Sequence, residues 1–229
     1  MIVLTAIFLV ILGTLPSFAW LVFFTSEDCH PEPRRLIFFT FLSGVIITFF
    51  TLQAQIFTNK WLLGFGIGNF SITSLIILTA IEEIAKFLAV FFIVHKQKEF
   101  DEPIDAMIYM IVAALGFAAV ENIALVFRTV NDPAIASGAI NIITLRFIGA
   151  TLLHALSSAI IGYYWAKAIF KQVSATLPII WGLVIATVLH AVFNYIIINV
   201  DSVVWPVVFL IIMAAFIFRD FEVFRHSKE

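Results

Sequence analysis

Residues 71–94 read SITSLIILTAIEEIAKFLAVFFIV and place three ionisable side chains, Glu82, Glu83 and Lys86, in the middle of an apolar run. As an α-helix, a run of this length spans the hydrocarbon core of a bilayer, which is about 30 Å thick. A Lys or Asp at the centre of such a helix costs about 2.5–3.5 kcal/mol on insertion scales. The three groups therefore need partners or a water-filled cavity, unless they form a purely structural ion cluster that holds helices together.

The rest of the chain repeats the apolar pattern without such a charged centre. The full chain of 229 residues is 62% hydrophobic and 12% charged, with a mean hydropathy of +1.10, which excludes an ordinary soluble domain. Six further runs of spanning length fall at Met1–Phe24, Leu36–Phe57, Ile104–Phe127, Phe147–Phe170, Leu177–Asn199 and Val203–Phe218. The first run has no Lys or Arg before it, so we interpret it as an uncleaved helix and not a secretory signal. The sequence predicts an all-α, polytopic transmembrane bundle of about seven spans, forming a single domain over residues 1–229.

The basic residues outside the spans predict the orientation. Nine lie at alternate span ends, namely Arg34, Arg35, Lys96, Lys98, Lys167, Lys171, Arg219, Arg225 and Lys228. The opposite ends have Lys60 and Arg128. Because loops rich in Lys and Arg stay in the cytoplasm, we expect the N-terminus outside and the C-terminus in the cytoplasm. The net charge of −2 gives no reason to expect a nucleic-acid partner.

Three further spans contain polar residues that an apolar helix does not need. The fourth has Glu121 and Asn122, the fifth has His154, and the sixth has His190 followed one turn later by Asn194. Taken singly, each could be a hydrogen-bonded packing residue. At 1.5 Å per residue from the expected outer ends, Glu82 lies roughly 16 Å deep, Glu121 and His154 roughly 10 Å, and His190 roughly 13 Å. These depths predict that the four helices bring the residues together in one layer, where they can activate water.

Helical spacing separates the two adjacent glutamates. Residues 100° apart on a helix diverge, and Lys86 is three residues from Glu83 and four from Glu82, so it can reach either carboxylate. Pairing with one leaves the other free. Outside this group, we interpret Asp105 as a helix N-terminal residue stabilised by the helix dipole. Cys29, the only cysteine, has no partner within the chain for a disulfide.

These motifs resemble those of the PrsW family of intramembrane proteases, relatives of the type II CAAX prenyl proteases. The matching pieces are Glu82-Glu83-x-x-Lys86, Asp105 leading through Gly116-Phe117-Ala118 to Glu121-Asn122, His154 followed by Gly162-Tyr163, and His190-x-x-x-Asn194. They cover about half of the chain, in the family's order and spacing. The resemblance places a catalytic core at residues 71–199.

The resemblance implies a membrane-embedded peptidase whose substrate is a membrane protein or a membrane-tethered peptide, as in cleavage of an anti-sigma factor. It implies catalytic roles for Glu82, Glu83, Glu121, His154, His190 and Asn194, with Lys86 and Asn122 as charge or structural partners. Glu82 would activate water and Glu83 would support it. His190 and Asn194 would polarise the scissile carbonyl. Glu121 stands where the CAAX relatives have a histidine, so roles do not transfer one to one.

Two chemistries stay open for this set. Zinc needs about three protein ligands and a water molecule, which Glu121, His154 and His190 could provide with Glu82 as the base. A metal-free mechanism needs only a glutamate and a histidine. We expect a bacterial or archaeal cytoplasmic membrane as the location.

The alternative function is an ion- or proton-coupled transporter that uses an intramembrane Glu, Lys and His relay. The polar groups gather in one layer and the spans show no inverted repeat, and both features disfavour transport. An inactive scaffold or receptor that keeps the fold also remains open.

Overall fold

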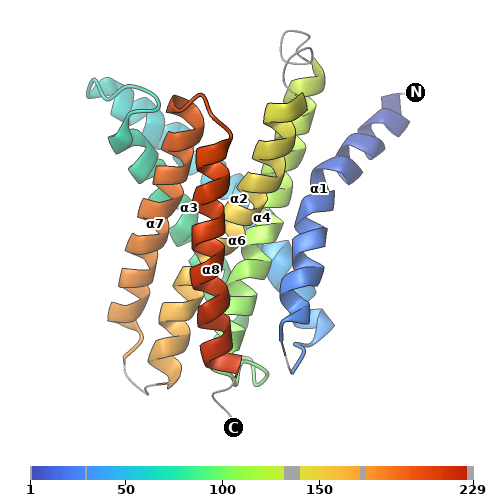
Figure 1. Cartoon of the computed structure of the whole chain (residues 1–229), viewed down its shortest axis with the longest axis vertical. Coiled ribbons are helices and arrows are strands. Elements are labelled where there is room, and N and C mark those ends of the chain that lie inside the picture. Colours follow the sequence, from blue (N-terminus) through green and yellow to red (C-terminus); the bar gives the residue numbers. More distant parts are fainter. Residues whose placement is uncertain (1, 29, 132–139, 171–173, 226–229) are drawn as a thin grey trace.

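The computed structural model describes residues 2–28, 30–131, 140–170 and 174–225 as seven helices joined by short loops, with no strand in these ranges (Figure 1). The helices are α1 (Ile2–Ser26), α2 (Arg34–Gly64), α3 (Ile72–Val94), α4 (Pro103–Asn131), α6 (Ile140–Phe170), α7 (Thr176–Asn199) and α8 (Val204–Arg225). Cys29 lies outside the described residues.

The all-helical class is confirmed, and each of the seven predicted spans lies on one helix. The helices α2, α6 and α8 extend seven residues beyond one predicted end, because a helix can continue past the apolar run that crosses the bilayer. Five helices in the described ranges, α1, α2, α4, α7 and α8, are long and apolar enough to cross a membrane. Helix α3 falls outside this group because Glu82, Glu83 and Lys86 share its centre. Helix α1 begins at one end of the bundle, and α8 finishes at the opposite end (Figure 1).

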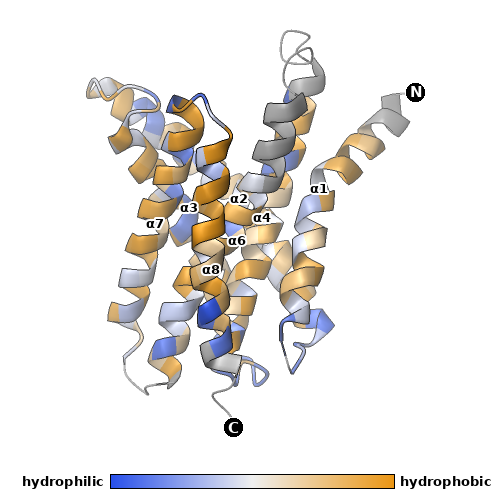
Figure 2. Cartoon of the chain, viewed as in Figure 1, coloured by the Kyte–Doolittle hydropathy of each residue, from blue (hydrophilic) through white to orange (hydrophobic). Residues whose placement is uncertain are grey.

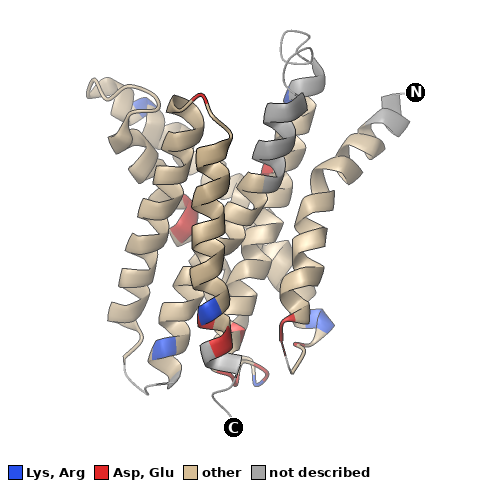
Figure 3. Ribbon diagram, viewed as in Figure 1, with Lys and Arg blue, Asp and Glu red and all other residues tan. Residues whose placement is uncertain are grey.

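The outer surface of the bundle is apolar, as a lipid-facing surface has to be. Large hydrophobic side chains such as Phe50, Phe92 and Trp205 are exposed. Hydrophobic residues predominate along most of the helices (Figure 2). The described Lys and Arg residues lie mainly toward the end of the bundle where α8 finishes (Figure 3), which agrees with the charge asymmetry of the sequence. This chain is therefore an integral membrane protein, while the side on which each terminus lies stays a prediction.

Helix α4 forms the centre of the bundle. All of its residues from Ile104 to Ala119 are buried, and it packs against α1, α2 and α6. A helix that is apolar on all sides is typical of such a buried position. The packing is closest where glycines meet backbone. A Cβ atom at Gly44 of α2 would collide with the carbonyl oxygen of Ala113, and one at Gly116 would collide with that of Phe41. These two positions bring α2 and α4 into backbone contact.

Hydrogen bonds at the helix starts tie the loops to the bundle. The Ser71 side chain accepts a hydrogen bond from the Ser74 N–H at 3.2 Å and caps α3. The Asp105 carboxyl group accepts from the backbone N–H groups of Asp101 and Glu102, at 3.0 and 2.7 Å, and lies in the first turn of α4, where the sequence placed it. Tyr109 of α4 donates its hydroxyl to Glu32 in the α1–α2 loop. Burial raises the pKa of the Glu32 carboxyl above its ordinary value, and hydrogen bonds from Tyr109 and Asp105 oppose that shift.

Candidate active site

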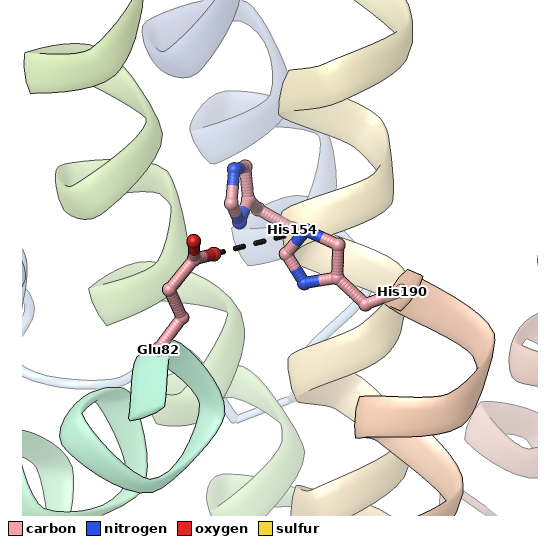
Figure 4. Close-up of side chains that lie close together, drawn as sticks. All are labelled: Glu82, His154 and His190. Atoms are coloured by element: carbon pink, nitrogen blue, oxygen red, sulfur yellow. Dashed lines mark ion pairs between the residues drawn. The ribbon is translucent and has the colours of Figure 1, made fainter. Parts of the chain in front are cut away.

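Helices α3, α4, α6 and α7 each bring ionisable side chains to one place inside the bundle. Helix α3 provides Glu82, Glu83 and Lys86, while α4, α6 and α7 provide Glu121, His154 and His190 respectively. Figure 4 shows the Glu82 carboxylate pointing from α3 toward the two imidazole rings. The rings of His154 and His190 meet edge to face with their centres 4.9 Å apart. Residues separated by more than a hundred positions in the sequence therefore form one cluster.

Glu83 is the most thoroughly hydrogen-bonded member of the cluster. Its side chain is 0% exposed, and Oε1 accepts from Lys86 Nζ at 2.7 Å and from Ser157 Oγ at 3.2 Å. His190 Nδ1 lies 2.6 Å from the same oxygen, and Ser158 Oγ donates to Oε2 at 3.3 Å. A buried carboxylate is tolerated only when it is paired and hydrogen-bonded in this way. Both Glu83 oxygens are thus already in use.

Lys86 of α3 contacts both Glu83 and His154. Besides its bond to Glu83, its ammonium group lies 3.1 Å from His154 Nδ1 and 5.2 Å from the centre of the Phe117 ring. An ammonium group only donates, so Nδ1 of His154 has to accept and the ring proton sits on Nε2. That Nε2–H donates to Glu121 Oε2 at 2.7 Å. Lys86 therefore sets the tautomer of His154 from the side opposite to Glu121.

Glu121 is the member of the cluster closest to the outside. Its side chain is 40% exposed, whereas that of its partner His154 is 4% exposed. A proton that leaves or reaches His154 therefore has a route through Glu121. The neighbouring residue Asn122 points elsewhere, because its side-chain amide donates to Thr151 Oγ1 at 2.8 Å and ties α4 to α6.

His190 has one ring nitrogen in use and one available. A carboxylate only accepts, so Nδ1 of His190 carries the proton in its bond to Glu83. Its other nitrogen, Nε2, then holds a lone pair and lies 3.7 Å from Glu82 Oε2 (Figure 4). Buried histidines that bind a metal or activate a nucleophile are usually oriented by a carboxylate on the opposite nitrogen, as Glu83 orients His190.

Glu82 presents one bound oxygen and one open oxygen. Its Oε1 accepts a hydrogen bond from the side-chain amide of Gln55 in α2, at 2.7 Å. Its Oε2 is buried and has no hydrogen-bond partner within the described part of the chain. An unpartnered carboxylate oxygen inside a bundle costs free energy unless water, a cation or a substrate binds to it. Glu82 Oε2 is consequently the atom of this cluster that is open for chemistry.

Our sequence analysis missed Gln55. It lies at the end of an apolar run that has no charged residue, and a single glutamine there did not stand out. The signal that could have found it is a polar stripe of Thr48, Thr51 and Gln55, whose spacings of three and four residues put them on one helical face. Asn194, which the sequence did single out, is half-buried one turn beyond His190 and makes no hydrogen bond to another described side chain.

The donor atoms fit a metal ion, although not with the ligand set expected from the sequence. Glu82, His154 and His190 each offer a ligand atom within 4.8 Å of the other two, and all three residues are buried. Glu121 does not belong to this trio, although its Oε2 lies 2.7 Å from His154 Nε2. The open oxygen of Glu82 and the lone pair of His190 Nε2 suit a divalent cation directly. Both ring nitrogens of His154 are already in contact, Nδ1 with Lys86 and Nε2 with Glu121, so one of these contacts has to give way before His154 can bind a cation.

Comparison with known proteins gives a consistent result. A family model described as PrsW family intramembrane metalloprotease matches residues 32–219. Protease PrsW of Geobacillus kaustophilus is 29% identical over 185 residues, which cover 80% of this chain and 76% of the relative. The protease of the same name from Clostridioides difficile is 25% identical over 92% of this chain and 87% of its own length. That of Bacillus subtilis is 27% identical over 80% of each chain. No solved structure matches this chain.

Proposed function

This chain belongs to the PrsW family of intramembrane metalloproteases and is an intramembrane protease, and we propose that Glu82 and His190 activate the water that attacks the scissile peptide bond. The observation that supports this assignment is the open oxygen of Glu82. It is buried without a hydrogen-bond partner and faces the unprotonated Nε2 of His190 at 3.7 Å. A water molecule between these two acceptors can donate a hydrogen bond to each of them.

In this proposal Glu82 takes the proton from the attacking water. A general base has to lie within hydrogen-bond reach of the proton that it removes, and it has to have an oxygen free to do so. Glu83 fails the second condition, because four donors surround its carboxylate. Its role is to hold Lys86 and to orient the His190 ring.

The remaining residues serve the later steps. His154 carries a proton on Nε2 and shares it with Glu121, so this pair can deliver a proton to the amine that leaves. Asn194 has a side-chain amide without another described partner, one turn from His190, and it can donate to the oxygen of the scissile carbonyl. The core of the reaction then lies within residues 71–199, as the sequence analysis expected.

We further propose that the metal implied by the family is zinc, held by Glu82, His154 and His190. A zinc ion supplies a Lewis acid and lowers the pKa of water toward neutrality. If zinc were bound there, Glu82 would serve as one of its ligands, and Glu121, hydrogen-bonded to His154, would be a further carboxylate that could take up a proton. In either case the open oxygen of Glu82 is essential.

The substrate that this site suits is a membrane protein with a single span, cut near or within the bilayer. The site lies among transmembrane helices, and Glu121 connects it to the exterior of the bundle. An anti-sigma-factor-like protein in the cytoplasmic membrane of a bacterium belongs to this class. A proton-coupled transporter remains the second candidate only if purified protein moves solute and cuts nothing.

The test is cleavage of single-span candidate substrates by purified protein in liposomes. We expect the wild type to cut at least one of them, and Glu82→Gln to lower the rate by at least about 100-fold, as expected for loss of a general base. Glu99→Gln, which removes a carboxylate from the α3–α4 loop, is the matched control and should cut at the wild-type rate. Full activity of Glu82→Gln would contradict the role of Glu82, and solute flux without proteolysis would favour transport.

A further inference from the structure

We infer that Gln55 of α2 is a positioning residue that holds the Glu82 carboxylate in the orientation in which one oxygen faces the reaction. This inference rests on the proposed function, because it concerns how Glu82 is held in place. It also extends the site beyond the core at residues 71–199, to a helix in which the sequence showed no catalytic motif.

The Gln55 side chain makes two hydrogen bonds to α3 with one amide group. Its Nε2 donates to the backbone carbonyl of Leu78 at 3.1 Å and to Glu82 Oε1 at 2.7 Å. A carbonyl oxygen only accepts, so the nitrogen of the amide has to face Leu78, and the orientation of the amide is fixed. Leu78 lies one helical turn before Glu82. The amide therefore bridges one turn of α3 and holds the carboxylate at a defined position on it.

This contact fixes the orientation of the Glu82 carboxylate. The terminal torsion of a glutamate side chain is broad, so an unrestrained carboxylate exchanges its two oxygens and samples many angles. With Oε1 held by Gln55, the other oxygen is left pointing toward His190. A base held within about 0.5 Å of its productive position is more effective than one that wanders.

The other polar side chains on this face of α2 do not share the role. Thr48 donates its hydroxyl to the carbonyl of Gly44 at 2.8 Å, and Thr51 donates to that of Ile47 at 2.9 Å. Both bonds stay within α2. In the described part of this helix, Gln55 is the side chain that reaches the cluster. Helix α2 packs against α4 at Gly44 and Gly116 and also packs against α3, so the tilt of α2 sets the position of Gln55 relative to α3.

The chain offers a matched control for this inference. Gln53 lies two residues earlier on the same helix, and its side chain is exposed. Substituting leucine at either position removes an amide of similar size from α2, but only Gln55→Leu removes the contact with Glu82. Any general effect of leucine on the insertion or packing of α2 appears in both variants.

The experiment measures the rate of substrate cleavage in liposomes against substrate concentration, together with the melting temperature. We expect Gln55→Leu to lower kcat about 10- to 100-fold, as for other outer partners of reactive groups, with KM unchanged. Gln53→Leu should match the wild type in kcat, KM and melting temperature. A Gln55→Leu variant with wild-type kcat would overturn the inference. So would a variant in which only KM or only the melting temperature changes.

A double-mutant cycle separates positioning from a structural role. If Gln55 acts through Glu82, its substitution should have a much smaller effect in a Glu82→Asp background, where the shorter carboxylate no longer reaches the amide. Additive effects would contradict positioning. If Glu82→Gln were itself fully active, the proposed function would fail first, whereas an inactive Glu82→Gln beside a normal Gln55→Leu would overturn the present inference alone.

Discussion

Glu82 and Glu83 are neighbours in the sequence, but they lie in two different environments. The Glu83 side of the cluster, between α3, α6 and α7, is closed, since both carboxylate oxygens accept hydrogen bonds and the side chain is 0% exposed. The Glu82 side, between α2, α3 and α7, is open at one oxygen. The difference follows from the 100° turn per residue of a helix. One carboxylate stabilises the arrangement, and the other is left available for the reaction.

The largest expected loss of activity comes from removing the metal proposed to bind on the Glu82 side of the cluster, which we call the open side. We expect purified protein to contain about one zinc ion per chain and to lose cleavage completely when a chelator removes it. Glu82→Gln should lower the bound zinc measured by elemental analysis, because it replaces a ligand. Ser158→Ala, which alters only the closed side, should keep the zinc. Full cleavage by protein shown to be free of metal would instead favour the glutamate mechanism.

Glu83→Gln should have the largest effect on stability. It leaves the Lys86 ammonium without its carboxylate inside the bundle, and breaking a buried ion pair costs about 3–5 kcal/mol. Thermal unfolding in detergent, followed by circular dichroism, measures the loss. Glu82→Gln is the matched comparison and should lower the melting temperature much less.

A compensating variant sharpens the same prediction. Adding Lys86→Met to Glu83→Gln removes the unpaired charge and should recover part of the lost stability without recovering activity. Equal destabilisation by Glu82→Gln and Glu83→Gln would contradict the distinction between the closed side and the open side.

Substitution of Glu121 should lower activity less than removal of the metal does. Glu121→Gln keeps an oxygen that accepts from His154 Nε2 but removes the charge and the proton acceptor. We expect cleavage to fall about 10- to 100-fold, with a melting temperature close to that of the wild type. A large loss of stability would mean that Glu121 belongs with the closed side.

The serines that donate to Glu83 should contribute less to stability than its ion pair with Lys86 does. Ser158 donates to Glu83 Oε2 at 3.3 Å, and the loss of one such hydrogen bond costs about 1 kcal/mol. Ser158→Ala should therefore lower the melting temperature slightly and leave the cleavage rate near the wild-type value. Ser174→Ala, at an exposed position, is the control and should unfold at the wild-type temperature. Loss of activity in Ser158→Ala with unchanged melting temperature would place this serine in the reaction itself.

Substitution of Glu32 should change the melting temperature least of all, and the size of this change should depend on pH. Its partners are Tyr109 and Asp105, and burial raises its pKa. A carboxyl group with a raised pKa stabilises the folded state most below its ordinary pKa of about 4.3, and this contribution is lost as the pH rises through the raised value. The melting temperature should therefore decrease slightly as the pH rises above about 4.3. Glu32→Gln should flatten that slope, and an unchanged slope would contradict the assignment.

The helices and the members of the cluster could be predicted from the sequence because both depend on strong local signals. An apolar run long enough to span a bilayer has few structural alternatives to a transmembrane helix. A Glu, Lys or His inside such a helix is costly enough to need a partner. Estimated depths were sufficient to place Glu82, His154 and His190 in one layer. The structure brings these three residues within 4.8 Å of one another.

The pairing within the cluster could not be predicted in the same way. Lys86 lies within reach of both glutamates, and only the position of α6 and α7 decides that it pairs with Glu83. The tautomers of His154 and His190 depend on the same contacts. The proposed ligand set changed from Glu121 to Glu82 for this reason, since helix spacing gives the depth of a side chain and not the direction in which its oxygens point.

The length of α2 makes the thickness of the bilayer relevant to the reaction. Its 31 residues extend about 46 Å, which exceeds a hydrocarbon core of about 30 Å, so the helix has to tilt or project. Gln55 lies about three turns, or about 16 Å, beyond the crossing with α4 at Gly44. A change in tilt of about 5° about that crossing would move Gln55 by about 1.4 Å, enough to break its 2.7 Å bond to Glu82. Lipids of different chain length would then alter the rate of cleavage without contacting the reactive residues.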